Sequence, residues 1–570
     1  MGDNDLGWTE NRATNQQERK SGPMQVARLI GGAGTGKTTE LLNIMKRVLP
    51  EVGHDPQAIG FASLTRAARE EMVKRASEAF DCHPSLLEGP GWFRTAHSTC
   101  HKMLGIKGDE LLAGDDKASK WVAERLRVAV SWRKVDDSGY RICVGDDEAA
   151  ASLTLWDIAR NRVEPLEAIH RAKSMAGIEV PPYGTVKYFV RKYEDCKRLD
   201  GKVDFVDILG RYAGIRFGLE GPESVDPEGP TPEGVQAWIF DEAQDSSKLL
   251  DAVCRRLAYA PGVKWAYLAA DPFQSVFGFG GADYSNFMGW NADKERTMPQ
   301  SWRCPAAVME LGERCLRRMR RGYFDRGIAP ASHDGRVINE PSIERAISQV
   351  DGSRTTLVLA RCKYSLKKFA DMLESRKVPH AYINEKSDTK SMTAYNAYWK
   401  IQHGQGISGE SWTAAIGLTP TKALGAAALL RYGEKAAWTS GRREDIDFLA
   451  ADEVVSLGGA TPELMQMIKE GRWAGLIDGG TNWYASAKKH GPEIATKPNV
   501  RLSTIHGAKG MEAQDVILST ETAARVERER ELDQRVHDEE CRVEYVGVTR
   551  AKERLIVCES DEPYAMELPL

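Results

Sequence analysis

The sequence predicts an α/β protein of two lobes, each built on a parallel sheet and each carrying a mainly helical insertion. Short runs of apolar and β-branched residues alternate with longer helical patterns along most of the chain, as expected where crossover helices join parallel strands. Most of these runs end at a polar or glycine-rich turn, which is where open α/β sheets bind ligands. The expected strands are Val26–Ile30, Ala237–Phe240, Trp265–Ala269, Thr356–Leu359, Val500–Thr504, Val516–Leu518 and Leu555–Val557.

Two charged, helix-like stretches interrupt this alternation and indicate the insertions. They span residues 105–202 and 385–498, and turns that contain glycine or proline punctuate both. The first sheet domain is therefore expected at residues 1–104 and 203–299, with its insertion at 105–202. The second sheet domain is expected at residues 300–384 and 499–570, with its insertion at 385–498.

Composition narrows the class of protein. The chain has 570 residues, a net charge of −4, 42% apolar residues and 28% charged residues, which is ordinary for a folded protein of several domains. No apolar run approaches the roughly 18 residues that cross a bilayer, so no membrane association is expected. The polar start of the chain lacks a secretory apolar core, and the 10 cysteines are scattered without a C-x-x-C pair. These features favour a cytoplasmic protein without a structural zinc site.

The clearest local motif follows the first expected strand. Residues Gly31 to Thr38 match G-x-x-x-x-G-K-[ST] and precede a helical run. Glycines let successive backbone N–H groups converge on phosphate oxygens, where side chains would obstruct them. Lys37 is expected to place its charge on the β- and γ-phosphates, and the Thr38 hydroxyl to complete a Mg²⁺ shell. The predicted ATP-binding residues of this loop are Gly32, Ala33, Gly34, Thr35, Gly36, Lys37, Thr38 and Thr39.

A pair of carboxylates after a second apolar strand adds the groups that hydrolysis requires. Strand Ala237–Phe240 ends in Asp241 and Glu242. Asp241 can hold Mg²⁺ through water, and Glu242 can orient and deprotonate the attacking water. Together the two motifs predict a site that hydrolyses ATP with Mg²⁺.

Further blocks along the chain resemble superfamily 1 DNA helicases of the UvrD/Rep/PcrA group. The blocks that carry the resemblance are Asn15–Gln17, Leu64–Met72, Thr95–Ser98, Val203–Leu209, Leu268–Ala282, Gln300–Pro305, Thr504–Glu512 and Val546–Ala551. The resemblance implies that the two lobes are RecA-like P-loop motor domains with ATP bound between them. It covers the chain from about residue 16 to 552 and leaves only the two insertions poorly matched.

For the nucleotide, the resemblance implies contacts from both lobes. Gln17 would read the adenine, Trp302 would cover its face, Glu512 would approach the ribose and Lys509 the phosphates. The γ-phosphate would be sensed from the first lobe and neutralised by two arginines of the second. The implied catalytic residues are Lys37, Asp241, Glu242, Gln274, Arg303 and Arg550.

The same resemblance implies a DNA strand that contacts both lobes. Phe277 and Phe279, in a glycine-rich loop, are expected to stack on bases, an interaction worth roughly 1–3 kcal/mol per base whatever the sequence. The residues implied to contact DNA are Thr65, Arg66, Thr95, His97, Phe277, Phe279, Thr504 and His506. The expected partners are single-stranded DNA and junctions of single and double strands, and no protein partner is indicated.

Three positions differ from the family pattern. Leu64 replaces an aromatic stacking platform, Thr39 stands where the family often has arginine, and Gly280 replaces the arginine of W-R-G-A. These differences bear on DNA grip and on coupling more than on hydrolysis. Outside the family blocks, a basic helical segment predicts either a solvated face or a phosphate-tracking patch. Its members are Arg314, Arg317, Arg318, Arg320 and Arg321.

The expected function is an ATP-dependent DNA helicase that translocates on single-stranded DNA and unwinds duplex, 3′ to 5′ by resemblance. One alternative is a translocase that strips proteins from a single strand without unwinding. A second is an ATP-gated interaction subunit of a replication or recombination complex, and RNA is a further possible track.

Overall fold

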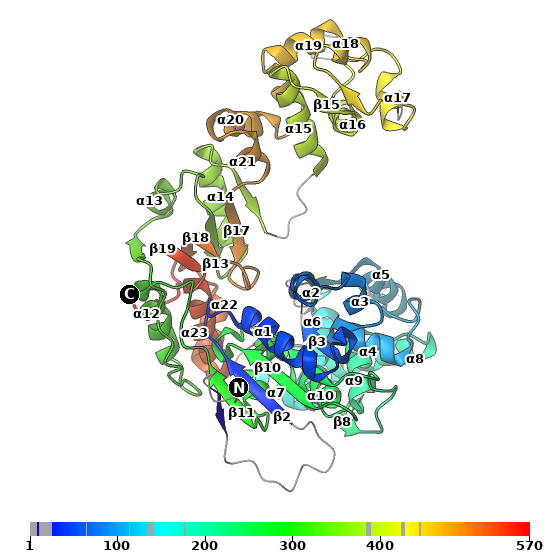
Figure 1. Cartoon of the computed structure of the whole chain (residues 1–570), viewed down its shortest axis with the longest axis vertical. Coiled ribbons are helices and arrows are strands. Elements are labelled where there is room, and N and C mark those ends of the chain that lie inside the picture. Colours follow the sequence, from blue (N-terminus) through cyan, green and yellow to red (C-terminus); the bar gives the residue numbers. More distant parts are fainter. Residues whose placement is uncertain are drawn as a thin grey trace.

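The computed structural model describes residues 8–10, 25–63, 65–112, 115–134, 141–175, 178–383, 389–422, 428–443 and 446–570. Two separate parallel sheets form the centres of two domains, and mainly helical segments extend from both (Figure 1). This confirms the predicted α/β class with two sheet domains and helical insertions. The residue boundaries between domains stay a prediction.

The first sheet places its strands in the order β1-β11-β2-β10-β9-β3-β4, all parallel except the short β1 at one edge. The strands are β1 (Thr9–Glu10), β2 (Gln25–Ile30), β3 (Ile59–Ser63), β4 (Trp92–Thr95), β9 (Ala237–Phe240), β10 (Trp265–Ala270) and β11 (Lys294–Thr297). The three strands predicted for this domain correspond to β2, β9 and β10. They are central and covered on both faces, which gives parallel strands their continuous apolar runs. Strand β11 has the polar sequence KERT and is only half-buried, so it gave no apolar signal.

Helices cover both faces of the first sheet. Alternate residues of β9 face opposite sides, because side chains alternate along a strand: Trp238 packs with α4, α9 and α10, and Ile239 with α1, α2 and α3. The helices are α1 (Lys37–Glu51), α2 (Arg66–Phe80), α3 (Pro84–Glu88), α4 (Ala96–Leu104), α9 (Phe205–Ala213), α10 (Lys248–Ala258) and α11 (Tyr284–Met288). Since five parallel neighbours end at one edge of the sheet, the loops after β2, β3, β4, β9 and β10 meet there.

The second sheet has the order β12-β19-β18-β13-β17-β14 and is parallel throughout. Its strands are β12 (Arg336–Glu340), β13 (Thr356–Ala360), β14 (His380–Tyr382), β17 (Val500–Thr504), β18 (Ala513–Ser519) and β19 (Ala551–Cys558). The four strands predicted here lie within β13, β17, β18 and β19. The helices of this domain are α12 (Ala306–Arg317), α13 (Ile343–Ser348), α14 (Ser365–Ser375), α22 (Ala524–Leu532) and α23 (Gln534–Val548).

The first insertion is helical with one added antiparallel strand pair that the sequence pattern did not predict. Its elements are α5 (Asp115–Leu126), β5 (Val130–Lys134), β6 (Arg141–Gly145), α6 (Asp147–Arg162), α7 (Leu166–Met175) and α8 (Tyr183–Leu199). Trp156, Val190 and Tyr193 belong to a core of its own. A second antiparallel pair, β7 (Ile215–Gly218) and β8 (Gly221–Ser224), follows α9.

The second insertion rises away from its sheet, at the top of Figure 1. Its helices are α15 (Thr389–Gln402), α16 (Gly409–Leu418), α17 (Glu434–Thr439), α18 (Glu453–Ser456), α19 (Pro462–Lys469), α20 (Gly480–His490) and α21 (Pro492–Thr496), with a short pair β15 (Ile407–Ser408) and β16 (Phe448–Leu449). Buried aromatic rings form its centre, where Tyr398 stacks on Trp473 at 5.2 Å between centroids. Such rings bury large apolar areas, so this insertion also has its own core. Among the described residues, no helix combines the length and the apolarity needed to cross a bilayer.

Candidate active site

The glycine-rich loop joins β2 to α1 at the carboxyl edge of the first sheet. Gly34 and Gly36 have positive φ angles of 68° and 81°, and Gly36 is the N-cap of α1. A side chain at Gly34 would begin 2.2 Å from the Cβ atom of Arg303, which lies in the second domain. The loop therefore needs glycine both for its own turn and for the close approach of the second domain. Thr35 is buried within the loop and donates its hydroxyl hydrogen to the Gly32 carbonyl at 3.1 Å.

Lys37 and Thr38 follow the loop at the start of α1. The Lys37 ammonium lies over the loop and donates to the Gly32 carbonyl at 3.2 Å. The Thr38 hydroxyl donates to an Asp241 carboxylate oxygen at 3.5 Å. A hydroxyl and a carboxylate are the hard oxygen ligands that Mg²⁺ takes beside phosphate, so this pair fits the predicted metal. Thr39 faces outward on the same helix, where it accepts a hydrogen bond from Arg75.

Asp241 and Glu242 differ in their electrostatic environments. Burial, and next the neighbouring Glu242 charge, raise the pKa of Asp241 to about 7, although Lys37 opposes this shift. For Glu242 burial also acts to raise the pKa, but Lys509 and Lys37 outweigh it, so the pKa is lowered. Glu242 adopts φ 55°, and its carboxylate accepts a hydrogen bond from Gln244 at 2.5 Å. An ionised carboxylate held in a fixed orientation beside the loop is what a general base requires.

The second domain touches the glycine-rich loop directly. The Ser301 hydroxyl donates to the Ala33 carbonyl at 2.8 Å, and the Trp302 backbone N–H donates to the Gly34 carbonyl at 2.8 Å. The Tyr545 hydroxyl accepts from the Ala33 N–H at 3.2 Å. The Trp302 side chain is 70% exposed beside Gly36. An open aromatic face at this place fits the predicted cover over the adenine.

Arg550 is the most enclosed of the predicted cations. It is 0% exposed, and its Nη2 donates to the Gln274 side-chain oxygen at 3.1 Å, across the boundary between the domains. Gln274 in turn donates from Nε2 to Asp271 at 2.8 Å. Burial, and next the charge of Arg303, lower the pKa of Arg550 to about 10. The structure therefore brings together two of the three residues predicted to contact the γ-phosphate, Gln274 from the first domain and Arg550 from the second.

Arg303, Glu512 and Lys509 are all engaged with protein groups. Arg303 Nε lies 2.6 Å from Glu512, and Lys552 lies 2.5 Å from the other oxygen of the same carboxylate. Burial acts to raise the pKa of Glu512, but these two cations lower it below its usual value. Lys509 pairs with Asp245 and donates to the Gln274 carbonyl at 2.6 Å. The hydrogen bonds of Lys509 therefore go to Asp245 and Gln274 and not to the glycine-rich loop, and its charge lowers the pKa of Glu242.

Three predicted DNA-contacting threonines have the same local role. Thr65 and Thr95 are the N-caps of α2 and α4, and their hydroxyls accept backbone N–H groups at 3.1 and 3.3 Å. Thr504 accepts the Gly507 N–H at 3.1 Å in the turn after β17. Each hydroxyl keeps its own hydrogen for a further acceptor, because capping uses only a lone pair. Thr95 and Thr504 are the last residues of β4 and β17, and Thr65 follows the end of β3. Arg66 is exposed in the first turn of α2.

The two rings of the aromatic loop differ in their burial. Phe277 is 1% exposed and belongs to an apolar cluster that combines residues of both domains, with the Lys509 ammonium 4.8 Å from its ring centroid. A buried ring has no open face, so the expected stacking of Phe277 on a base stays a prediction that requires this loop to rearrange. Phe279 is only partly buried and meets His506 edge-on at 5.9 Å. His506 is itself buried, and burial lowers its pKa far below the usual value.

The remaining predicted residues are His97, the two positions Gln17 and Leu64, and the arginines of the basic segment. His97 is partly buried and meets Phe205 edge-on at 5.8 Å. Gln17 and Leu64 lie outside the described residues. Within the basic segment, Arg314 pairs with Glu310 and Arg318 with Glu544, so part of that segment serves structure.

Sequence reasoning missed Arg326, which lies in an irregular segment between α12 and β12. Its guanidinium is buried, contacts Asp271 at 2.6 Å and Glu313 at 2.5 Å, and reaches Tyr545. A single arginine without a repeat or a motif carries no local signal. Only its position between the two domains marks it.

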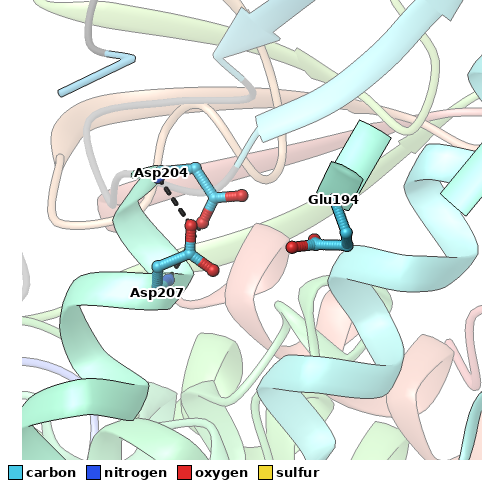
Figure 2. A group of neighbouring side chains, drawn as sticks. All are labelled: Glu194, Asp204 and Asp207. Atoms are coloured by element: carbon cyan, nitrogen blue, oxygen red, sulfur yellow. Dashed lines mark hydrogen bonds between the residues drawn. The ribbon is translucent and has the colours of Figure 1, made fainter. Parts of the chain in front are cut away.

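Three carboxylates of the first domain and its insertion lie close enough together to resemble a metal centre. Figure 2 shows Asp204 and Asp207 at the start of α9 facing Glu194 of α8. The space among them is already filled by cations, since Lys197 lies 2.6 Å from Asp207 and Arg160 lies 2.9 Å from Asp204. The cluster is an ion network that joins the insertion to α9, because Arg160 and Lys197 contact all three carboxylates.

The first domain carries a P-loop, and the second brings the buried Arg550 to it. This arrangement defines a P-loop NTPase of the two-domain helicase class. The UvrD/REP helicase N-terminal domain model matches residues 11–295, and the UvrD-like helicase C-terminal domain model matches residues 485–562. The chain belongs to the UvrD/Rep helicase family and is a DNA helicase of that family. No curated protein matches the chain.

Proposed function

We propose that this protein couples ATP hydrolysis to movement along single-stranded DNA, and thereby unwinds duplex. The observation that carries the proposal is the hydrogen bond between Arg550 and Gln274, which joins the two domains beside the glycine-rich loop. Groups on both domains then face one γ-phosphate, so its cleavage changes the contacts that hold the domains together. Family membership supports 3′ to 5′ movement.

The proposed roles follow the geometry. Lys37 and the loop N–H groups would hold the phosphates, while Thr38 and Asp241 would hold Mg²⁺, which supplies charge neutralisation when bound. Glu242 would accept a proton from water, since its pKa is lowered and its orientation is fixed by Gln244. Arg550 would stabilise charge that develops on the γ-phosphate.

Two further roles need a rearrangement of the present contacts. Arg303 is paired with Glu512, so reaching the γ-phosphate requires that this ion pair open. Glu512 would then be released toward the ribose, with Lys552 as its remaining partner. Trp302 needs no such change, because its ring is already exposed.

Movement on a single strand without unwinding is a second candidate, favoured by one observation. Phe277 is buried, so the loop offers a single partly exposed ring, that of Phe279, to the bases. Each stacked base contributes roughly 1–3 kcal/mol, so one ring fewer weakens the grip needed to pull a duplex apart.

The test is the ATPase rate with and without single-stranded DNA of defined length, beside fork unwinding and streptavidin displacement. Stimulation by DNA together with unwinding supports the helicase. Stimulation and displacement without unwinding support the translocase. ATPase that DNA does not stimulate contradicts both, and favours an ATP-gated interaction subunit. Comparing DNA with RNA oligonucleotides tests the track.

A further inference from the structure

The loop at residues 275–281 links the two sites proposed above, because Gln274 precedes it and it carries Phe279. The second domain holds its backbone at two points, both from α23. Arg542 Nε donates to the Ser275 carbonyl at 2.7 Å, and the Glu539 carboxylate accepts the Gly278 N–H at 2.9 Å. Charge-assisted hydrogen bonds of this kind are stronger than neutral ones.

The first insertion holds the same loop from another direction. Arg162, the last residue of α6, donates from Nη2 to the Gly278 carbonyl at 2.9 Å. One peptide region is thus bound by a carboxylate of the second domain on its N–H side and by a guanidinium of the insertion on its carbonyl side. The preceding residue, Asn161, lies against Gly281.

The packing around the loop leaves no space for a side chain at Gly278 or Gly281. A Cβ atom at Gly278 would lie 2.3 Å from a Glu539 oxygen, and one at Gly281 would lie 2.9 Å from the Asn161 Cβ. Gly281 also has φ 95°, a conformation that other residues rarely adopt. The loop backbone is consequently in direct contact with both neighbours, and a shift of either neighbour must displace it.

Helix α23 connects this contact with the nucleotide site. It packs on β18 of the second sheet and on the turn Pro272–Gln274 of the first domain. Glu539 lies near its start, and Arg550 follows its end about three helical turns later. A movement of α23 therefore acts on the loop at Gln274, through Arg550, and at Gly278, through Glu539.

The other side of the loop is open. A cavity of about 620 Å³ borders Gly278 and Gly281, and both Arg162 and Glu539 line it. The loop can move into this space when its two holders move. Glu164 and Gln534 line the same cavity, and neither donates or accepts a side-chain hydrogen bond with the loop in the described part of the chain.

We propose that Glu539 and Arg162 are positioning residues that transmit the nucleotide state of the cleft to the DNA-facing loop. The inference rests on the proposed coupling of ATP hydrolysis to DNA movement. We name Glu539, Arg162 and the Gly278 peptide the loop clamp. Both side chains bind the loop backbone and lie away from the glycine-rich loop. The loop clamp therefore acts on how much movement along DNA each hydrolysed ATP produces, and not on hydrolysis itself.

The test compares Glu539→Ala and Arg162→Ala with the wild type. The measured quantities are the ATPase rate without DNA, the rate with saturating oligo(dT), and the ATP consumed per streptavidin displaced. We expect the DNA-free rate and the KM for ATP to stay within about twofold, while ATP consumed per displacement rises about five- to tenfold. Arg162→Lys and Glu539→Gln keep a donor and an acceptor, so both should restore most of the coupling.

The controls are Glu164→Ala and Gln534→Ala, because both residues line the same cavity and neither belongs to the proposed DNA-binding residues or the basic segment. Wild-type coupling in both loop-clamp alanine variants overturns this inference while leaving the proposed function intact. A wild-type enzyme whose ATPase ignores DNA overturns both. If circular dichroism shows that Glu539→Ala does not fold, the comparison of Arg162→Ala with Arg162→Lys is the deciding test. Equal losses in the control variants also overturn the inference, because they would show a general effect of the cavity.

Discussion

Arg326 and Asp271 form an ion pair between the two sheet domains, with Nη1 2.6 Å from Oδ1 and with side chains only 2% and 0% exposed. Glu313 holds the other side of the guanidinium, and the Tyr545 hydroxyl donates to the same aspartate at 3.1 Å. The pair joins the end of β10, next to the predicted γ-phosphate sensor, to α12 and α23 of the second domain. It is thus a buried structural link between the two sheet domains.

Replacing Arg326 by methionine should lower the free energy of unfolding by about 3–5 kcal/mol, because the buried Asp271 carboxylate would lose the cation that it pairs with. Adding Asp271→Asn to Arg326→Met should recover part of this loss. The measurement is urea denaturation of both single variants, the double variant and the wild type. Arg336→Gln, an exposed arginine on β12, is the control and should be neutral. Strict additivity of the two single effects would contradict the coupling.

Lys37→Ala should lower kcat for ATP hydrolysis by at least about 10²-fold, because the variant loses a fixed positive charge over the phosphate loop. Lys46→Ala removes an exposed lysine from the same helix and should leave the rate unchanged. Steady-state ATPase with saturating DNA measures both. An active Lys37 variant would show that the nucleotide is not bound at this loop.

Arg550→Ala should reduce DNA-stimulated ATPase by roughly 10³–10⁵-fold, as expected for an arginine that neutralises the transferred phosphate. Gln274→Ala should weaken the same reaction, since it loses the hydrogen bond to Arg550. Nucleotide affinity, measured by fluorescent ATP analogue titration, should change much less than the rate. Losses in affinity that match the losses in rate would indicate a ground-state binding role instead.

Phe277 and Phe279 should respond in opposite ways to truncation. Phe279→Ala should weaken binding of single-stranded DNA by about 1–3 kcal/mol with little change in stability, because its ring is only partly buried. Phe277→Ala should instead lower the free energy of unfolding by about 3–5 kcal/mol, because it removes a buried ring. Fluorescence anisotropy and urea denaturation separate the two effects. If both variants lost the same DNA affinity and Phe277→Ala kept normal stability, Phe277 would be a DNA-contacting residue after all.

Glu544 predicts a pH dependence of stability. It is fully buried between Arg318 at 2.8 Å and Arg530 at 3.3 Å, and burial raises its pKa to about 7, with Glu540 and Glu527 adding to the rise. Because the pKa of Glu544 is higher in the folded state than in the unfolded state, the unfolded state loses this proton at a lower pH. The stability that Glu544 contributes is therefore complete below its ordinary pKa and falls as the pH rises toward about 7.

Glu544→Gln should flatten this dependence, because the variant has no carboxyl to ionise at this position. Between pH 5 and pH 8 the urea midpoint of the wild type should therefore fall relative to that of the variant. Glu531→Gln, on the exposed side of α22, is the matched control and should follow the wild type at both values. A constant difference between wild type and Glu544→Gln would show that this carboxyl does not titrate in the range.

The amino-acid sequence alone determined the class of fold and the chemistry of the nucleotide loop. The central strands were predictable because strands covered on both faces are continuous apolar runs, as in β2 and β9. The glycine-rich loop was predictable because its function depends on backbone geometry that only a short local pattern provides. The polar strand β11 and the β5–β6 pair lacked such a pattern.

Tertiary structure decided which residues meet. Phe277 and Phe279 look equivalent in sequence, yet the packing of the second domain buries one ring and leaves the other partly open. Arg326 and Glu539 have no local signature, because their partners lie on elements distant in the chain. Burial and electrostatic pairing depend on every neighbour in space, so no linear pattern encodes them residue by residue.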